Sequence, residues 1–283
     1  MNTGSKFTSW EAAVHWLRGQ PEQRDLVWAA YYDDPIFSAA ARYHASEEWS
    51  CVRRLLPQAG DALDVGAGRG IASYALARDG FSVTALEPDG SSLVGAQAIR
   101  NLSQESGLQI NVCQEFSERL PFADARFDVV FARAVLHHTR DLRGACKEFL
   151  RVLKPGGVFV AVREHVISRP EDLPTFLDLH PLHKLYGGEN AFLLRQYVDA
   201  IRGAGFELQR VLAPLESPIN FAPHSRKTLQ LEIARRIGGS VPGLSGLVAW
   251  GLGLPAVWTL LLPLLGRIDH RPGRHYSFVC RRP

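Results

Sequence analysis

Three glycines at alternate positions are the residues whose spacing points most directly to chemistry. Gly66, Gly68 and Gly70 come straight after a strand pattern with the apolar residues Ala62, Leu63 and Val65, and a helical pattern over residues 71–78 follows them. Glycine lets the backbone turn tightly and approach a ligand closely, and a helix start attracts phosphate and other polar groups. The pattern therefore predicts a nucleotide-like ligand at a strand-to-helix turn.

The spacing of the glycines also separates two classes of ligand. A dinucleotide fingerprint has the form Gly-x-Gly-x-x-Gly, whereas the sixth position here is Ile71 and the pattern is Gly-x-Gly-x-Gly. Glu87 ends the next predicted strand, about twenty residues past the turn, where a carboxylate can accept both hydroxyls of a ribose. A carboxylate at a strand end can also be merely solvated, but its position after the glycines favours ribose binding.

Two adjacent histidines, His137 and His138, follow the fourth predicted strand, at the edge where open α/β sheets place ligands. Imidazole gains or loses a proton near neutral pH, so either side chain could act as a general base. The alternative is that both cap a helix or bind backbone groups. The sequence leaves these two interpretations open.

A second polar stretch, residues 180–192, is unusually rich in hydrogen-bonding side chains for a connection. Its His-x-x-His pair could bind a metal together with a nearby glutamate, but no cysteine supports this and Pro181 argues against a regular helix. We expect instead no metal, and a loop or lid that binds a second substrate. Its candidate residues are His180, His183, Tyr186, Glu189 and Asn190.

Strand and helix patterns alternate along most of the chain, which is typical of a doubly wound parallel sheet. We expect one α/β domain with a mostly parallel seven-stranded sheet over residues 59–283, preceded by a helical flap, residues 1–58, of the same domain. The predicted strands are 62–65, 82–86, 109–113, 127–132, 158–163, 206–212 and 275–282. The predicted helices are 9–18, after a capping box that begins at Thr8, and 21–31, 35–55, 71–78, 91–105, 141–153 and 194–204.

The predicted flap is dense in aromatic side chains, which can pack on the sheet or cover the ligand. We expect most of them to be core residues. For Tyr31, Arg42 and Tyr43 both interpretations stay open.

Residues 214–272 form an insertion before the last strand, and no charged residue occurs between Arg236 and Arg267. This run is long enough to cross a bilayer, which takes roughly 20 apolar residues. However, the strands on either side must pair in one sheet, and prolines and glycines interrupt the run. It therefore suits a helical hairpin that dips into a membrane interface or covers an apolar substrate through residues 241–266. A dimer interface or additional core is the alternative.

Composition bounds the remaining choices. The 283 residues are 46% hydrophobic and 22% charged with a net charge of +3, as in ordinary folded proteins. The sequence contains no basic block with interleaved aromatic residues that would suggest nucleic-acid binding. The four cysteines are far apart and no secretory signal is recognisable, so we expect a cytoplasmic protein, with membrane association as an option.

Several motifs in order give the sequence a family likeness. They are the stretch 63–70, Glu87, the Leu-Pro-Phe of residues 120–122, Phe-Asp-Val-Val at 127–130, Leu-His-His at 136–138 and Leu-Lys-Pro-Gly-Gly at 153–157. Together they resemble a class I S-adenosylmethionine-dependent methyltransferase of the small-molecule branch, which includes quinone-biosynthesis enzymes. The likeness covers about the middle third of the chain.

The resemblance implies S-adenosylmethionine as cofactor, a Rossmann-like fold and roles for particular residues. The loop after the third strand would cradle adenine, where Glu115 binds the adenine amine or Phe116 stacks on the ring. His137 or His138 would border the acceptor, although methyl transfer can proceed by positioning alone. The implied cofactor-binding residues are Asp64, Gly66, Ala67, Gly68, Gly70, Glu87, Pro88, Glu115, Phe116, Arg133 and Tyr43, and Tyr31 joins the substrate-binding set.

We therefore expect a methyltransferase acting on a small, lipophilic acceptor at oxygen, nitrogen or carbon. One alternative is a nicotinamide-dependent oxidoreductase, which the glycine spacing and the lack of a Tyr-x-x-x-Lys pair disfavour. Another is a non-catalytic, membrane-docked ligand-binding relative. A nucleic-acid methyltransferase is disfavoured because its Asn/Asp-Pro-Pro-Tyr/Phe motif is absent.

Overall fold

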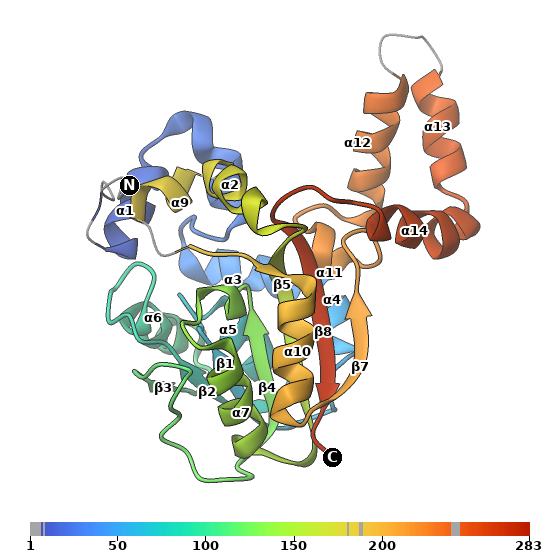
Figure 1. Cartoon of the computed structure of the whole chain (residues 1–283). Helices are drawn as coiled ribbons and strands as arrows, with labels where there is room; N and C mark the ends of the chain where they lie inside the picture. Colours follow the sequence, from blue (N-terminus) through green and yellow to red (C-terminus); the bar gives the residue numbers. More distant parts are fainter. Residues whose placement is uncertain (1–6, 8, 180, 187–188, 239–243) are drawn as a thin grey trace.

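One twisted sheet with helices on both faces forms the body of the molecule (Figure 1). The computed structural model describes residues 7, 9–179, 181–186, 189–238 and 244–283. The strand order is β3-β2-β1-β4-β5-β8-β7, with the short β6 paired to β5. The strands are β1 (Gly60–Val65), β2 (Phe81–Leu86), β3 (Ile110–Cys113), β4 (Phe127–Arg133), β5 (Leu153–Ile167), β6 (Phe192–Leu193), β7 (Glu207–Leu212) and β8 (Arg274–Arg281).

The mostly parallel sheet confirms the predicted fold class. β1 pairs in parallel with β2 and β4, and β4 pairs in parallel with β5, whereas β8 runs antiparallel to both β5 and β7. The parallel strands are buried on both faces, which explains their nearly continuous apolar sequences. All seven predicted strands exist within a few residues of the expected bounds.

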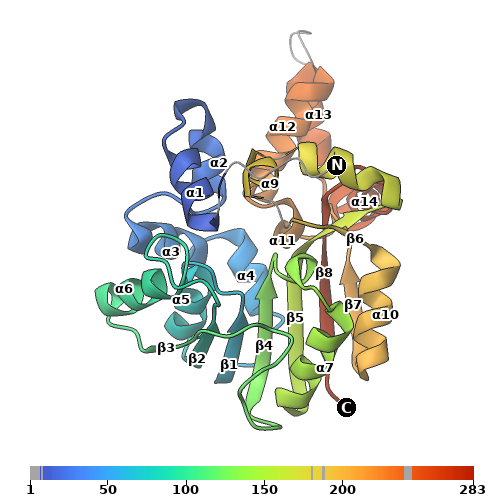
Figure 2. The ribbon, with the colours of Figure 1, turned by 60° about the vertical axis from the view of Figure 1, so that its left-hand side comes forward.

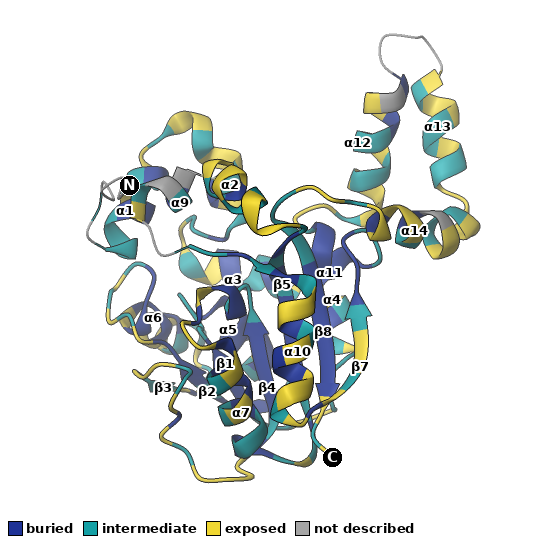
Figure 3. Cartoon of the chain, viewed as in Figure 1, coloured by how far each residue is buried: buried dark blue, intermediate teal, exposed yellow. Residues whose placement is uncertain are grey.

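Two apolar cores lie on opposite faces of the sheet, and Figure 3 shows the buried strands between them. One core lies under α3 (Ile36–His44), α4 (Glu47–Arg53), α5 (Ile71–Arg78) and α6 (Ala96–Ser106). The other lies under α7 (Leu142–Val152) and α10 (Leu194–Ala204). Successive residues of β1 serve both, since Ala62 belongs to the first core and Leu63 to the second.

The N-terminal helices sit beyond the carboxyl ends of the parallel strands (Figure 2). α1 (Trp10–Arg18) and α2 (Arg24–Ala29) share a small apolar cluster with α9 (Pro181–Tyr186), a segment far away in the sequence. Ser9 caps α1 by accepting a hydrogen bond from the Ala12 backbone N–H. The predicted cap, Thr8, lies outside the described residues.

Four predicted elements differ from the structure. The predicted helix 35–55 is two helices, because α3 ends at His44 and the Ser46 hydroxyl caps the start of α4. The helix expected from residue 91 begins only at Ala96, after turns of residues 92–94. β5 extends to Ile167, so Glu164 lies inside the strand, not at its end. Pro181 starts α9 although it was expected to oppose a helix, since proline is accepted in a first turn.

The insertion before β8 projects from the sheet as a helical hairpin of α12 (Arg226–Gly238) and α13 (Leu244–Leu252) (Figure 1). α11 (Pro218–Phe221) precedes it, and the π-helix Val257–Leu261 and α14 (Leu262–Arg267) follow it. Within the described chain, no single helix is long and apolar enough to span a bilayer; α13 and the segment Val257–Arg267 qualify only as a pair bent by 67°. Residues 241–243 of the predicted membrane segment lie outside the described residues.

Candidate functional site

The glycine turn between β1 and α5, called the cradle below, is closely packed at Gly66 and open at Gly68. Gly66, Gly68 and Gly70 have φ angles of +60°, +55° and +83°, which non-glycine residues rarely adopt. A Cβ on Gly66 would lie 2.7 Å from the Val135 side chain, whereas one on Gly68 would meet nothing closer than 3.9 Å. The turn thus packs tightly against the loop after β4 and leaves its Gly68 side free for a ligand.

Glu87 is bonded directly to this turn. Its carboxylate accepts hydrogen bonds from the Gly68 backbone N–H at 2.7 Å and from the Asp89 N–H at 2.9 Å. Burial raises the pKa of Glu87 to about 7, and the two backbone donors oppose that rise. Each carboxylate oxygen accepts more than one hydrogen bond, so lone pairs remain for the two hydroxyls of a ribose.

Asp64 lies just below the turn, at the end of β1. It is buried and accepts a 2.6 Å hydrogen bond from the Ser73 hydroxyl of α5. Desolvation raises the pKa of Asp64 to about 7. Ala67 and Gly70 form the remainder of the turn, which the Gly70 N–H closes by donating to the Ala67 carbonyl.

The loop after β3 also faces the carboxyl edge of the sheet. Glu115 and Phe116 are both exposed there, with 62% of Phe116 accessible, and Pro88 is exposed beside Glu87. Their position agrees with an adenine-binding role, which stays a prediction for all three side chains.

Arg133 and Tyr43 occupy a buried polar layer behind the turn. Arg133 forms two hydrogen bonds to the Glu48 carboxylate, at 2.7 and 3.1 Å, and its guanidinium lies 5.2 Å from the Tyr43 ring centre and 5.5 Å from that of Tyr31. Tyr43 is fully buried and Tyr31 nearly so, and the two rings meet edge to face. In this state Arg133 is therefore engaged with a protein carboxylate.

The two predicted histidines lie on the 3-10 turn Leu136–His138 after β4, and the structure places Glu164 beneath them. Glu164 is completely buried and accepts the backbone N–H groups of Val135, Leu136 and His137, as well as sharing a 2.8 Å hydrogen bond with His137 Nδ1. Burial raises the pKa of Glu164 to about 7 and lowers the pKa of His137 to about 3, whereas the His138 side chain is half-exposed. His137 is therefore neutral at physiological pH and able to accept a proton, but a pKa this low makes it a weak general base.

Part of the predicted polar loop converges on the same histidines. Glu189 Oε2 lies 3.8 Å from a ring nitrogen of each of three histidines, His137, His138 and His183. Burial raises the pKa of Glu189 to about 7. Tyr186 lies apart from this group and packs edge to face on Trp10, and Asn190 follows Glu189 at an intermediate exposure. His180 lies outside the described residues.

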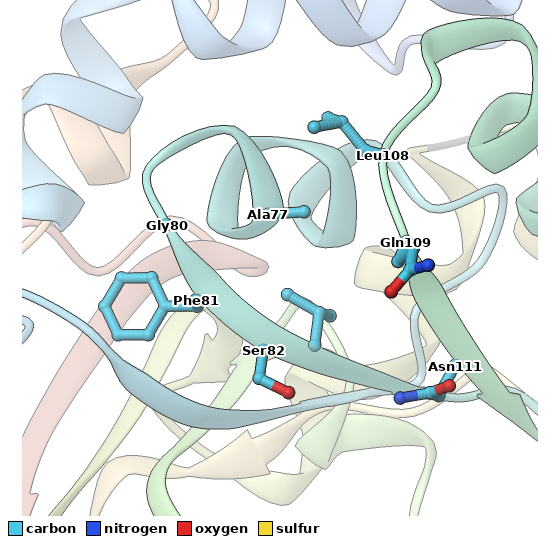
Figure 4. A pocket seen from close by; sticks show the side chains of 8 residues that line it. Ala77, Gly80, Phe81, Ser82, Leu108, Gln109 and Asn111 are labelled. Atoms are coloured by element: carbon cyan, nitrogen blue, oxygen red, sulfur yellow. The ribbon is translucent and has the colours of Figure 1, made fainter.

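A surface hollow on the molecule lies away from this region. It is lined by α5, β2 and β3 residues at the amino ends of the two strands, where Ser82, Gln109 and Asn111 are drawn in Figure 4. Ligands of open α/β sheets bind at the carboxyl ends of strands, so this hollow is not the candidate site.

The sequence did not single out four residues that organise the site. Arg69 of the glycine turn is buried and donates to the carbonyls of Tyr31 and Asp33 and to the Asp34 carboxylate. Glu48 and Glu164 each hold another predicted residue, and Arg163 donates to backbone carbonyls behind the same layer. Of the four, only Arg69 had a signal in the sequence, because it is a charged residue inside the glycine turn. The contacts of Glu48, Glu164 and Arg163 depend on tertiary packing.

Comparison with known proteins gives consistent matches. A family model described as "Methyltransferase domain" matches residues 63–161. The ubiquinone biosynthesis O-methyltransferase of Methylobacterium nodulans is 37% identical over 110 residues, which are 38% of this chain and 43% of that protein. The O-methyltransferase resE of Aspergillus sclerotiorum is 31% identical over 193 residues, 65% of this chain and 69% of that protein.

The solved structure of geranyl diphosphate C-methyltransferase from Streptomyces coelicolor A3(2) superposes with a TM-score of 0.58 at 15% identity, covering 99% of this chain and 87% of that one. This likeness concerns the fold. Five curated relatives, beginning with the M. nodulans enzyme, are matched over only 38% to 48% of their own length.

Proposed function

Because the chain belongs to the class I S-adenosylmethionine-dependent methyltransferases, we propose that it transfers a methyl group from S-adenosylmethionine to an oxygen, nitrogen or carbon atom of a small acceptor. The observation that carries this proposal is the hydrogen bond between the Glu87 carboxylate and the Gly68 N–H, because it joins a ribose acceptor to an open glycine cradle. When bound, the cofactor supplies a methyl group already activated on a sulfonium.

The residues present suit such a cofactor. The Gly68 side of the turn has room for a ligand that a Cβ would fill. Glu87 would hold the ribose hydroxyls, the exposed loop of Glu115 and Phe116 would border the adenine, and Asp64 would keep the end of β1 and the start of α5 together. Each role matches what the side chain offers, and together they line one edge of the sheet.

The acceptor would bind between the loop after β4 and the helical cover. We propose that residues 1–58 form a flap of the same domain over residues 59–283, with Tyr31 and the polar groups of α9 and residues 189–190 on the acceptor side. His137 and His138 are the candidate proton acceptors for an acceptor hydroxyl or amine, although the low pKa of His137 makes it a weak base. In-line positioning would supply the larger part of the rate.

The cofactor proposal is tested by calorimetric titration of the protein with S-adenosylmethionine. We expect saturable binding that Glu87→Ala and Gly68→Val each weaken by roughly tenfold or more, because one loses the charge-assisted bonds to ribose and the other fills the cradle. Ser82→Ala, at an exposed position of β2, the strand that ends just before Glu87, is the matched control and should bind normally. Equal affinity in wild type and both variants would contradict the proposal.

We further propose that the acceptor is lipophilic and that the α12–α13 hairpin meets a membrane surface. Large apolar side chains are exposed along it, among them Leu247 at 69% and Trp250 at 71%. Exposed apolar patches of this kind mark interaction sites. Arg235 and Arg236 lie on α12 with exposed side chains, which suits an anionic lipid surface.

Sedimentation of the full chain with phosphatidylglycerol-containing vesicles tests this contact. Trp250→Glu should reduce vesicle binding several-fold, because burying a charge at the apolar interface is costly. Trp28→Glu replaces a half-exposed tryptophan elsewhere on the molecule and should bind as wild type does. Self-association of the wild type that Trp250→Glu abolishes, without vesicle binding, would instead assign the hairpin to a dimer interface.

A further inference from the structure

Three histidines and one glutamate from separate segments meet at the carboxyl edge of β4 and β5. His137 and His138 come from the 3-10 turn after β4, His183 from α9, and Glu189 from the stretch before β6. The proposed methyl transfer gives none of them more than a proton to accept. The proposed methyl transfer therefore does not explain why folding brings these four potential metal-ligand side chains together.

Their spacing is too wide for direct hydrogen bonds and suits an ion between them. Glu189 Oε2 lies 3.8 Å from His137 Nε2, from His138 Nδ1 and from His183 Nε2. A hydrogen bond would need about 3.2 Å or less, whereas two ligands of a tetrahedral metal, each about 2.1 Å from it, are about 3.4 Å apart. The ligand atoms of His137, His138 and Glu189 all lie within 4.8 Å of one another, so small side-chain rotations would close the site.

The buried carboxylate oxygen supplies an independent indication. The Glu189 side chain is only 4% exposed, and its Oε2 has no hydrogen-bond partner in the part of the chain that the structure describes. Leaving a buried acceptor unsatisfied costs about 1–3 kcal/mol, and more when it is charged. A bound cation would satisfy this oxygen.

Glu164 orients one of the histidines in the way that metal sites require. An ionised Glu164 accepts the Nδ1–H of His137 at 2.8 Å, which leaves the Nε2 lone pair directed to the side of Glu189. A metal-binding histidine commonly donates its other ring N–H to a carboxylate, which fixes the ring and makes it a better ligand. The three backbone N–H groups that Glu164 also accepts hold the whole turn in place.

We propose that His137, His138 and Glu189 bind one divalent first-row transition ion, with His183 as an additional ligand. Imidazole and carboxylate ligands without thiolate suit ions such as Zn²⁺, Fe²⁺ or Co²⁺ better than Mg²⁺. The His138 side chain is 44% exposed, so the site opens to one side. If the proposed methyl transfer holds, an acceptor hydroxyl would take the open position, where the ion would lower the pKa of that hydroxyl and its proton would pass to solvent; His137 and His138 would then act as ligands and not as general bases.

Titration with Co²⁺ tests the site directly. We expect the chelator-treated full-length protein to bind one equivalent of Co²⁺, with visible absorption bands typical of nitrogen and oxygen ligands in a distorted geometry. Glu189→Gln and His138→Ala should each weaken binding by at least about tenfold. His15→Ala, which removes an exposed histidine on α1, should leave the affinity unchanged. Zn²⁺ should displace the Co²⁺, and Mg²⁺ should not.

The inference is overturned if wild type and Glu189→Gln take up Co²⁺ equally, or if the wild-type spectrum shows only the hydrated ion, as expected when water fills the cluster. Circular dichroism of the metal-free variants verifies that each is folded, and His138→Ala removes only a half-exposed side chain. S-adenosylmethionine titration of the same samples separates the two proposals. A wild-type protein that binds S-adenosylmethionine but not Co²⁺ removes only the metal site, and one that binds Co²⁺ but not S-adenosylmethionine removes only the proposed function.

Discussion

Replacing Glu48 by glutamine should lower the free energy of unfolding by about 3–5 kcal/mol. Glu48 is 2% exposed and forms a two-bond ion pair with Arg133. Its removal leaves the guanidinium uncompensated among Tyr31, Tyr43 and the nearby Arg163. A neutral amide can still accept one hydrogen bond, but it cannot balance the charge. Urea unfolding followed by circular dichroism measures the loss.

The control for this prediction is Glu232→Gln, which breaks an exposed pair with Arg236 on α12 and should change stability little. A Glu48→Leu/Arg133→Met double variant should recover much of the loss, because it removes both buried charges together. If Glu48→Gln unfolds with the wild-type midpoint, the buried pair contributes nothing and Arg133 is free to serve a ligand.

The parallel sheet could be predicted because each of its strands has a local signal. A parallel strand buried on both faces needs a short apolar run, and the glycines, prolines and caps around it are set by neighbouring residues. Ile71–Arg78 and Leu194–Ala204 were predicted with the bounds that the structure gives, since glycines adjoin both helices. The break between α3 and α4 was not predicted because the apolar pattern continues through it. The only local sign of the break is a single capping residue, Ser46.

In the candidate site too, contacts within a local motif could be predicted and contacts between distant segments could not. The glycine turn and Glu87 are joined by a motif of fixed spacing, so their contact could be anticipated. His183 and Glu189 were expected to act with His180, as neighbours in sequence, whereas the structure groups them with His137 and His138, which lie more than forty residues earlier. That grouping depends on α9 packing onto α1, a contact between distant segments that no local pattern encodes.

Replacing Arg69 by methionine should detach the N-terminal helices from the glycine turn without unfolding the sheet. Arg69 is 6% exposed and donates to the carbonyls of Tyr31 and Asp33, both at 3.0 Å, and to the Asp34 carboxylate at 2.8 Å. Hydrogen bonds from a charged donor contribute about 1.5–3 kcal/mol each. Tyr31 also holds an unfavourable φ of +60° that these bonds help to maintain.

We therefore expect amide hydrogen exchange across α2 and the residues up to Asp34 to accelerate by roughly a hundredfold, corresponding to about 3 kcal/mol of local stability. Exchange in β1 and β4 should stay slow. Arg18→Met is the matched control, because Arg18 contacts the half-exposed Asp34 carboxylate from a surface position and donates to neither carbonyl. Equal exchange in Arg69→Met and wild type would mean that apolar packing with α9 alone holds the N-terminal helices in place. Faster exchange in Arg69→Met would instead mean that this arginine, which lies between Gly68 and Gly70, couples the N-terminal helices to the glycine turn.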